Sequence, residues 1–133
     1  MGEHLEGCFE VSNWSEEVAP GGRDDASGVT VARYEERWTG DIDGEARCDV
    51  VISNEEGVGA RFVGFQRVVG SSGDRQGSFV LQTAGVVSAA GLRATAEVVP
   101  GSGRDGFATL RGRASMVSLV DGKPAWTLDC SFE

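Results

Sequence analysis

The stretch that decides the fold is ARFVGFQRVVGSSGDRQGSFVLQT, which runs from Ala60 to Thr83. Two runs rich in Val, Phe and Leu flank a centre of Gly, Ser and Asp, which are residues that favour turns. Apolar runs of strand length on both sides of such a turn predict a β-hairpin. Gln66 and Thr83 interrupt the apolar pattern, where a hydrophobic side chain would serve stability better. The hairpin therefore raises the question of a polar site inside a sheet.

The same pattern extends over the rest of the chain. Apolar residues recur with a period of two, and turns rich in Gly, Pro and Asp interrupt them at short intervals. We expect about eight strands, at residues 7–14, 29–40, 45–53, 58–70, 77–87, 92–99, 111–120 and 125–132. Short connections make neighbouring strands antiparallel, and closure into a barrel removes exposed sheet edges. The predicted fold is all-β: one antiparallel up-and-down barrel over residues 1–133, with a mobile polar loop at 15–28.

Composition narrows the function classes. The chain has 133 residues and a formal net charge of −9. An acidic protein lacks the positive field that nucleic acid or an anionic membrane surface requires, so we expect neither as a partner. Glycine is abundant, at 20 residues, without a collagen-like period, which indicates tight turns and close backbone contacts.

Cysteine usage and the N-terminus indicate a reducing compartment. Cys8, Cys48 and Cys130 are odd in number and lack the spacing of a disulfide framework or a zinc site. The N-terminus resembles no signal peptide, and no apolar run has the length of a membrane span. We therefore expect a cytoplasmic protein, and we expect no metal and no cofactor, since the paired acids occur in turns without metal-loop spacing.

Strand alternation sorts the inward side chains of residues 29–40. Arg33 and Arg37 mark the solvent face, which places Tyr34, Glu36 and Trp38 on the inner face. Glu36 is thus a carboxylate expected between two aromatic rings inside the barrel. Burial there would raise its pKa and suit it to general acid or base catalysis. The plainer alternative is a strand-end carboxylate that reaches solvent or pairs with an arginine.

The quoted hairpin contributes the second inward polar group. Arg61 and Arg67 mark its outer face, so Phe62, Gly64 and Gln66 are expected inside. An amide both donates and accepts hydrogen bonds, which suits it to hold a carbonyl or hydroxyl of a ligand. An internally satisfied core amide is an equally good interpretation.

These considerations select the candidate site residues. Glu36, Gln66 and Tyr34 are the candidate catalytic groups, although Tyr34 can equally be explained as packing. Small inward residues would leave room for a ligand in a barrel of this size. The inward residues expected to bind a ligand, or otherwise to form ordinary core, are Trp38, Phe62, Phe79, Thr83, Met116 and Trp126.

Four motifs resemble a known family. They are RWTGDIDGEA at 37–46, FVGFQRVVGSSGDRQGSFVLQ at 62–82, VVPGSGRDGFATLRGR at 98–113 and WTLDCSFE at 126–133. Together they resemble the uncharacterised bacterial family called domain of unknown function 3224, over nearly the whole chain. The resemblance implies a small β-barrel similar to that of allene oxide cyclase, a cofactor-free enzyme that works on an oxidised fatty acid. It implies no established activity.

The chain departs from the family pattern at two inward positions. Where the family usually has Gly-Leu-Glu-Arg, this chain has Gly64, Phe65, Gln66 and Arg67. Where the family usually has Leu-Gln-His, this chain has Thr83 in place of the histidine. Acid–base chemistry that depends on that glutamate and histidine therefore does not carry over, and we expect a remodelled interior.

Two functions remain open. The first is a barrel that binds a lipophilic, partly oxygenated small molecule and, as a cofactor-free cyclase or isomerase, holds it in a reactive conformation. The second is a non-catalytic carrier, sensor or scaffold whose core is filled by its own side chains. Either could self-associate through an apolar outer patch of Val63, Phe65 and Val69. An interior cavity of ligand size would distinguish them.

Overall fold

The computed structural model describes residues 2–18, 28–55, 57, 59–119 and 122–132. Over this part of the chain it contains strands and turns but no helix, and hence no helix that is long and apolar enough to cross a membrane. The strands are β1 (Gly2–Val18), β2 (Val29–Gly40), β3 (Asp43–Glu55), β4 (Gly59–Ser72), β5 (Arg75–Ser88), β6 (Gly91–Val98), β7 (Arg104–Asp105), β8 (Leu110–Leu119) and β9 (Ala125–Phe132).

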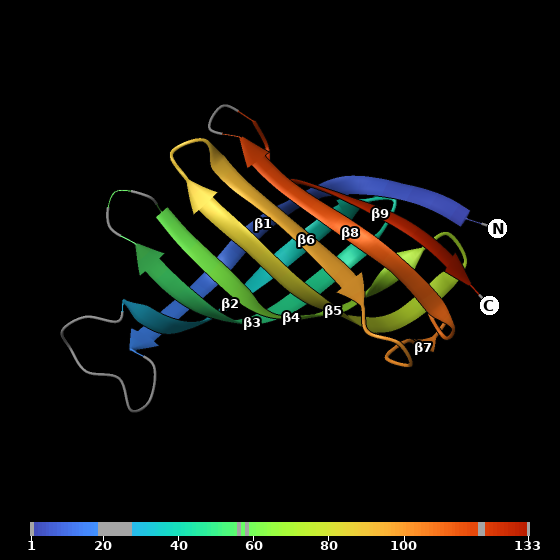
Figure 1. Cartoon of the computed structure of the whole chain (residues 1–133). Helices are drawn as coiled ribbons and strands as arrows, with labels where there is room; N and C mark the ends of the chain where they lie inside the picture. The colour runs from blue at the N-terminus through green and yellow to red at the C-terminus, as the bar shows by residue number, and fades with distance from the viewer. Residues whose placement is uncertain (1, 19–27, 56, 58, 120–121, 133) are drawn as a thin grey trace.

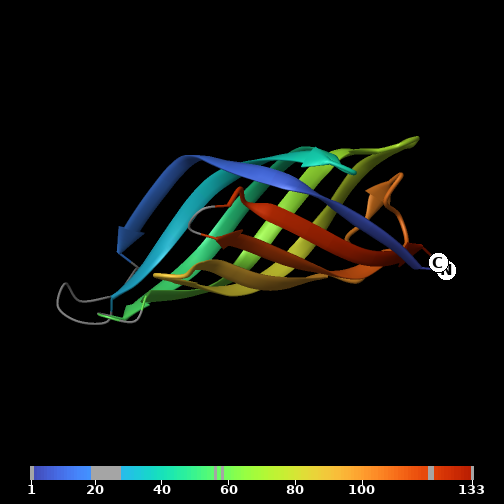
Figure 2. The same cartoon turned by 90° about the horizontal axis from the view of Figure 1, so that it is seen from above.

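Eight of these strands form a closed antiparallel barrel, as the sequence predicted. β1 to β6 pair in chain order, β8 follows β6, and β9 closes the ring against β1. Both chain termini lie at one end of the barrel, here called the proximal end, and the β5–β6 turn lies at the opposite, distal end (Figures 1 and 2). β7 is an additional two-residue strand that pairs with β5 at Gly77 and Ser78.

The first strand differs from the expected one. We expected residues 7–14, but β1 starts at Gly2 and continues to Val18. Its N-terminal part is held by β9, and the His4 ring lies 2.6 Å from a carboxylate oxygen of Asp129. The expectation of a mobile loop over 15–28 is therefore wrong for 15–18, which pair with β2. The part of that loop at 19–27 lies outside the described residues.

A row of glycines lets the sheet bend near the proximal end. Gly44, Gly70 and Gly77 are successive cross-strand partners on β3, β4 and β5. A Cβ added to Gly44 would lie 2.3 Å from the carbonyl oxygen of Val69, and one added to Gly77 would lie 2.1 Å from that of Arg104. Only glycine allows the backbones to approach so closely. Part of the glycine surplus therefore builds the barrel wall itself.

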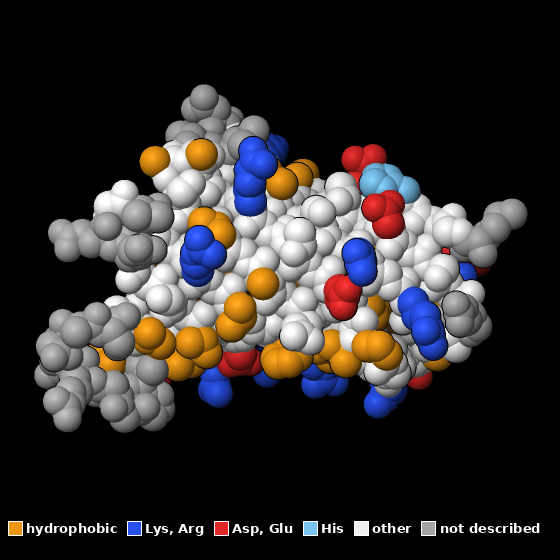
Figure 3. Space-filling model, in the orientation of Figure 1, with side chains coloured by type: hydrophobic (Ala, Val, Ile, Leu, Met, Phe, Trp, Pro, Cys, Tyr) orange, Lys and Arg blue, Asp and Glu red, His pale blue; other side chains and the backbone are white. Residues whose placement is uncertain are grey.

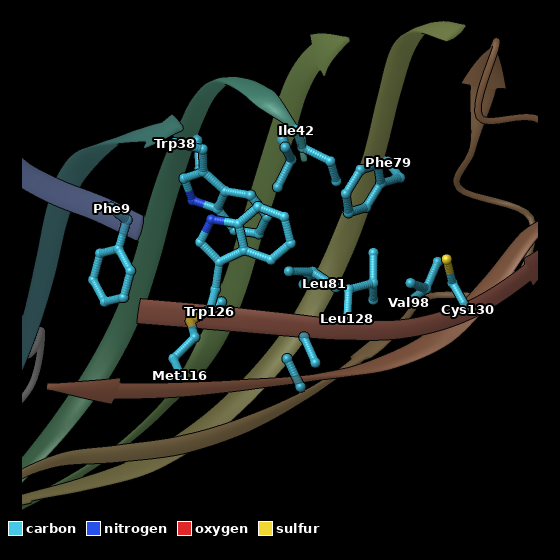
Figure 4. Close-up of a cluster of buried hydrophobic side chains, with 14 of the residues drawn as sticks. Phe9, Trp38, Ile42, Phe79, Leu81, Val98, Met116, Trp126, Leu128 and Cys130 are labelled. Carbon is cyan, nitrogen blue, oxygen red and sulfur yellow. The ribbon is translucent and has the colours of Figure 1, made fainter. Parts of the chain in front are cut away.

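The proximal half of the barrel, here called the packed half, is filled by large apolar side chains. The rings of Trp38 and Trp126 stack with centroids 4.7 Å apart, and Figure 4 shows them facing each other across the interior. Phe79 makes an edge contact with Phe107 at 5.1 Å. All four rings are at most 1% exposed. Ile42, Phe107 and Leu110, which the sequence pattern placed in connections, also belong to this core.

The predicted alternation of faces is confirmed along the strands that form the interior. Glu36, Gln66 and Thr83 are the polar residues among the buried side chains of the described chain. Arg33 instead lies outside, where it pairs with Asp49 at 2.8 Å while both side chains remain mostly exposed. An exposed pair of this kind contributes little stability. The buried polar residues are therefore the exceptional feature of the interior.

Candidate functional site

The distal half of the barrel contains a cavity of about 220 Å³, and it is here called the cavity half. Its wall is mainly apolar. The rings on this wall come from Phe9, Trp14, Tyr34 and Phe62, and the polar side chains from Glu36, Gln66, Thr83 and Ser118. An apolar hollow with a few polar groups is typical of small-molecule sites.

Glu36 is held inside the barrel by two donors. Its Oε1 accepts a hydrogen bond from Nε1 of Trp38 at 3.0 Å and one from Nε2 of Gln66 at 2.9 Å. Within the described chain its Oε2 accepts no hydrogen bond, and no cation pairs with the carboxylate. Burial raises the pKa of Glu36 from 4.5 to about 6, while the two hydrogen bonds lower it and only partly offset the burial. Glu36 therefore changes its charge close to neutral pH.

Gln66 is the least satisfied polar group of the interior. Its side chain is 1% exposed, and its Nε2 donates to Glu36 and lies 3.5 Å from Sγ of Cys48. Its Oε1 is buried and has no hydrogen-bond partner in the described chain. A buried acceptor without a donor costs about 1–3 kcal/mol, so stability alone does not explain this side chain. Because its nitrogen is already engaged, Gln66 offers a ligand an acceptor and not the donor that a carbonyl would need.

Tyr34 and Cys48 complete the polar layer as neutral groups. They are direct cross-strand partners on β2 and β3. Burial, above all, raises the pKa of the Tyr34 phenol and of the Cys48 thiol well above their usual values, and the negative charge of Glu36 acts in the same direction. Cys48 is thus no thiolate nucleophile.

A β-bulge on β1 brings an unexpected residue to the cavity. The β1–β2 register shifts between Ser12 and Ser15, and Asn13 has φ 55°. The extra residue reverses the inward alternation, so that Trp14 lines the cavity and stacks on Tyr34 with centroids 4.8 Å apart. Sequence reasoning missed Trp14. The signal that could have found it is Asn13, because asparagine inside a strand tolerates the left-handed backbone of a bulge.

The other predicted ligand-binding residues fall into two groups. Phe62, Thr83 and Met116 line the cavity with Glu36, Gln66 and Tyr34. Thr83 also makes a long hydrogen bond of 3.4 Å to the carbonyl oxygen of Thr95. The structure places the remaining three, Trp38, Phe79 and Trp126, in the packed half, where they do not line the cavity.

Val11 lies at the distal rim of the same cavity. It lines the cavity while its residue is 48% exposed. A rim of this kind contributes apolar surface without closing the site.

A larger hollow lies on the outer wall. It measures about 740 Å³ and crosses β2 to β6 and β8, over the exposed side chains of Val51, Val63 and Phe65. Val69, the third member of the predicted outer patch, is 52% exposed and lies outside this hollow. Figure 3 shows apolar side chains gathered along the lower edge of the molecule, with basic side chains beside them. The charged side chains that line this hollow, such as Glu97 and Arg113, are exposed, whereas the buried Glu36 and Gln66 line the interior cavity, which is therefore the better candidate site.

The acidic clusters make no metal site in the described part of the chain. No group of three or more His, Cys, Asp and Glu residues there could hold a metal ion. The three cysteines are unpaired: Cys8 is exposed, and Cys48 and Cys130 are buried.

Known proteins resemble this chain in both sequence and structure. A family model described as "Protein of unknown function (DUF3224)" matches residues 5–129. A crystal structure of a protein with unknown function from the DUF3224 family of Shewanella oneidensis MR-1 superimposes with a TM-score of 0.82 at 26% sequence identity. The similarity covers 100% of this chain and 99% of that one. Among curated proteins, none matches this chain.

Proposed function

Because this chain belongs to the DUF3224 family, whose description names no activity, we propose its function from the cavity: the barrel binds a small lipophilic molecule that carries a polar group. One observation carries the proposal. The cavity half combines a hollow of about 220 Å³ with two buried polar side chains, Glu36 and Gln66, whose hydrogen-bonding capacity is only partly used.

The size of the cavity limits the ligand. Pockets for drug-sized molecules measure roughly 300–1,000 Å³, and this one is smaller. Leu92, Met116 and Phe62 would contact the apolar part of the ligand, and Glu36 and Gln66 its polar part. A long oxidised fatty acid, as in allene oxide cyclase, would fit only with a large part of its chain outside.

A catalytic version of this function is the second candidate. Here the barrel would cyclise or isomerise its ligand without a cofactor, with Glu36 as the proton acceptor. The supporting observation is that the pKa of Glu36 is raised to about 6 inside the cavity, near the value at which a general base works best. The expected signature is a turnover that depends on one group with a pKa near 6.

Two further expectations from the sequence stay proposals. A reducing compartment such as the cytoplasm agrees with three unpaired cysteines, one of them exposed. Self-association through Val63, Phe65 and Val69 agrees with their exposure, which exceeds half for each of them.

Binding can be tested with 2-phenylethanol, a small aromatic molecule with one hydroxyl group. We expect ligand-observed NMR to detect binding to the wild type. Ala94→Leu should abolish it, because Ala94 lines the cavity and is 6% exposed, so that three added carbons would fill the hollow. Thr95→Leu is the matched control, since the neighbouring side chain on β6 faces outward and is exposed. Equal signals from the wild type and from Ala94→Leu would show that the molecule binds elsewhere.

Native mass spectrometry of the gently purified protein is the complementary measurement. A co-purifying small molecule that is released on unfolding would support the binding barrel and identify its natural ligand.

A further inference from the structure

The cavity half has the electrostatics of a site for a cation. Glu36 is the one charged side chain among the residues that line it, and no Lys, Arg or His lines it in the described chain. The salt bridges among the described residues lie on the barrel surface, and none of them involves Glu36. A buried carboxylate without a cation is costly, and a ligand with the opposite charge would remove that cost.

The unused hydrogen-bonding atoms of the Glu36–Gln66 pair are acceptors. Gln66 has an unpartnered Oε1, and Glu36 has an Oε2 that accepts nothing within the described chain. The two side chains are joined by a 2.9 Å hydrogen bond, so these atoms belong to adjacent groups. The donors aimed at this pair are already used, since Nε1 of Trp38 and Nε2 of Gln66 both point at Glu36. A ligand that satisfies this pair has to bring its own N–H or O–H groups.

The aromatic walls also favour a positive charge. Phe9, Trp14, Tyr34 and Phe62 all line the cavity, and Trp14 and Tyr34 are stacked. Aromatic faces attract cations within about 6 Å, by about 0.5–2 kcal/mol depending on desolvation. An ammonium group in this cavity would thus have the Glu36 carboxylate and several aromatic rings around it, with the unpartnered amide oxygen of Gln66 on the neighbouring side chain.

We propose that the ligand is a small primary or secondary amine, bound as its ammonium ion, with an apolar chain or ring in the rest of the cavity. This inference rests on the proposed function and specifies the ligand class of the same site. Glu36 supplies the counter-charge, and Gln66 accepts an N–H through Oε1. A quaternary ammonium ion binds less well, because it has no N–H for Gln66.

Three small molecules of similar shape but different charge test whether the cavity prefers a cation. They are phenethylamine as the cation, 2-phenylethanol as the neutral molecule and phenylacetate as the anion, titrated by calorimetry at pH 7.5. We expect phenethylamine to bind at least tenfold more tightly than the alcohol, and phenylacetate to bind weakest. Equal or tighter binding of the alcohol would overturn the amine while leaving the binding barrel intact. Failure of all three probes to bind would overturn both proposals.

Two variants test whether the preference for phenethylamine depends on Glu36. Glu36→Gln keeps the size of the side chain and an oxygen for Trp38 and Gln66, so we expect it to remove the preference for phenethylamine and to retain the alcohol. Glu10→Gln is the matched control: it removes the same charge from an exposed position on β1 and should leave all three affinities unchanged. An undiminished preference in Glu36→Gln would overturn the role of the carboxylate even if the wild type prefers the amine.

Discussion

The two halves of this barrel share one backbone pattern and differ in what faces inward. In the packed half, Trp38 and Trp126 fill the space between opposite walls, and both are at most 1% exposed. In the cavity half, smaller residues such as Ala94 face inward, and the polar groups Glu36 and Gln66 occupy positions that core residues would otherwise take. A β-barrel of eight strands is just wide enough for either outcome. The size and polarity of a few inward side chains therefore decide whether a region of the barrel is a packed core or contains a cavity.

The largest expected difference between the halves concerns stability. Leu128 lies in the packed half and is 1% exposed, whereas Leu92 lines the cavity and is half-buried. We expect Leu128→Ala to lower the free energy of unfolding by about 3–5 kcal/mol, because it leaves a void in a close-packed core. Leu92→Ala should cost less than about 2 kcal/mol, since it only enlarges an existing hollow. Urea denaturation measures both.

The two leucine variants also test whether the two halves of the barrel differ in packing. Equal losses for Leu128→Ala and Leu92→Ala would mean that the cavity half is as tightly packed as the other. The proposed binding site would then have no structural basis.

The second prediction concerns the carboxylate of the cavity half. The pKa of Glu36 is raised from 4.5 to about 6, so between these two pH values the folded state binds more protons than the unfolded state. The contribution of Glu36 to the free energy of unfolding therefore falls as pH rises through this window. Above pH 6 the deficit amounts to roughly 2 kcal/mol, from 1.36 kcal/mol for each pKa unit. Tyr34 and Cys48, which lie beside Glu36, stay neutral over the same range because burial raises the pKa of each.

Glu36→Gln imitates the protonated side chain at every pH. We expect it to raise the free energy of unfolding by up to about 2 kcal/mol at pH 8, and to have little effect at pH 4.5. Denaturation curves at both pH values measure the difference between variant and wild type. A difference that does not change with pH would show that Glu36 is not desolvated, and the contrast between the halves would then be one of size alone.

The packed half could be predicted largely from the sequence. A period of two separates Trp38, Phe79 and Trp126 from the arginines of the outer face, and burial of large rings makes this register strongly preferred. Ile42 and Phe107 escaped prediction because they lie next to turns, where alternation gives no information. Their burial depends on how the connections fold over the proximal end.

For the cavity half, the sequence predicted which polar residues face inward, but it did not predict the shape of the cavity. Alternation placed Glu36, Gln66 and Tyr34 inside, but it could not reveal which atoms of Gln66 are engaged. It also could not place Trp14, because one added residue in a bulge reverses the faces of the strand beyond it. The volume of the cavity could not be predicted, because it depends on the distance between opposite walls of the barrel. The residue pattern of a single strand gives no information on that distance.

The smallest prediction addresses the bulge that completes the cavity wall. Asn13 has φ 55°, a conformation that costs an ordinary L-residue roughly 1–2 kcal/mol and glycine very little. Asn13→Ala and Asn13→Gly both lose the 3.3 Å hydrogen bond from Nδ2 to Glu35, so the difference between them isolates the backbone. We expect Asn13→Ala to be about 1 kcal/mol less stable than Asn13→Gly. We also expect it to shift the resonance of Trp14, but not those of Trp38 and Trp126, in ¹⁹F NMR of the fluorotryptophan-labelled protein. Equal stability of the two variants, with Trp14 unmoved, would mean that the bulge does not hold Trp14 against Tyr34, and the aromatic wall would need another support.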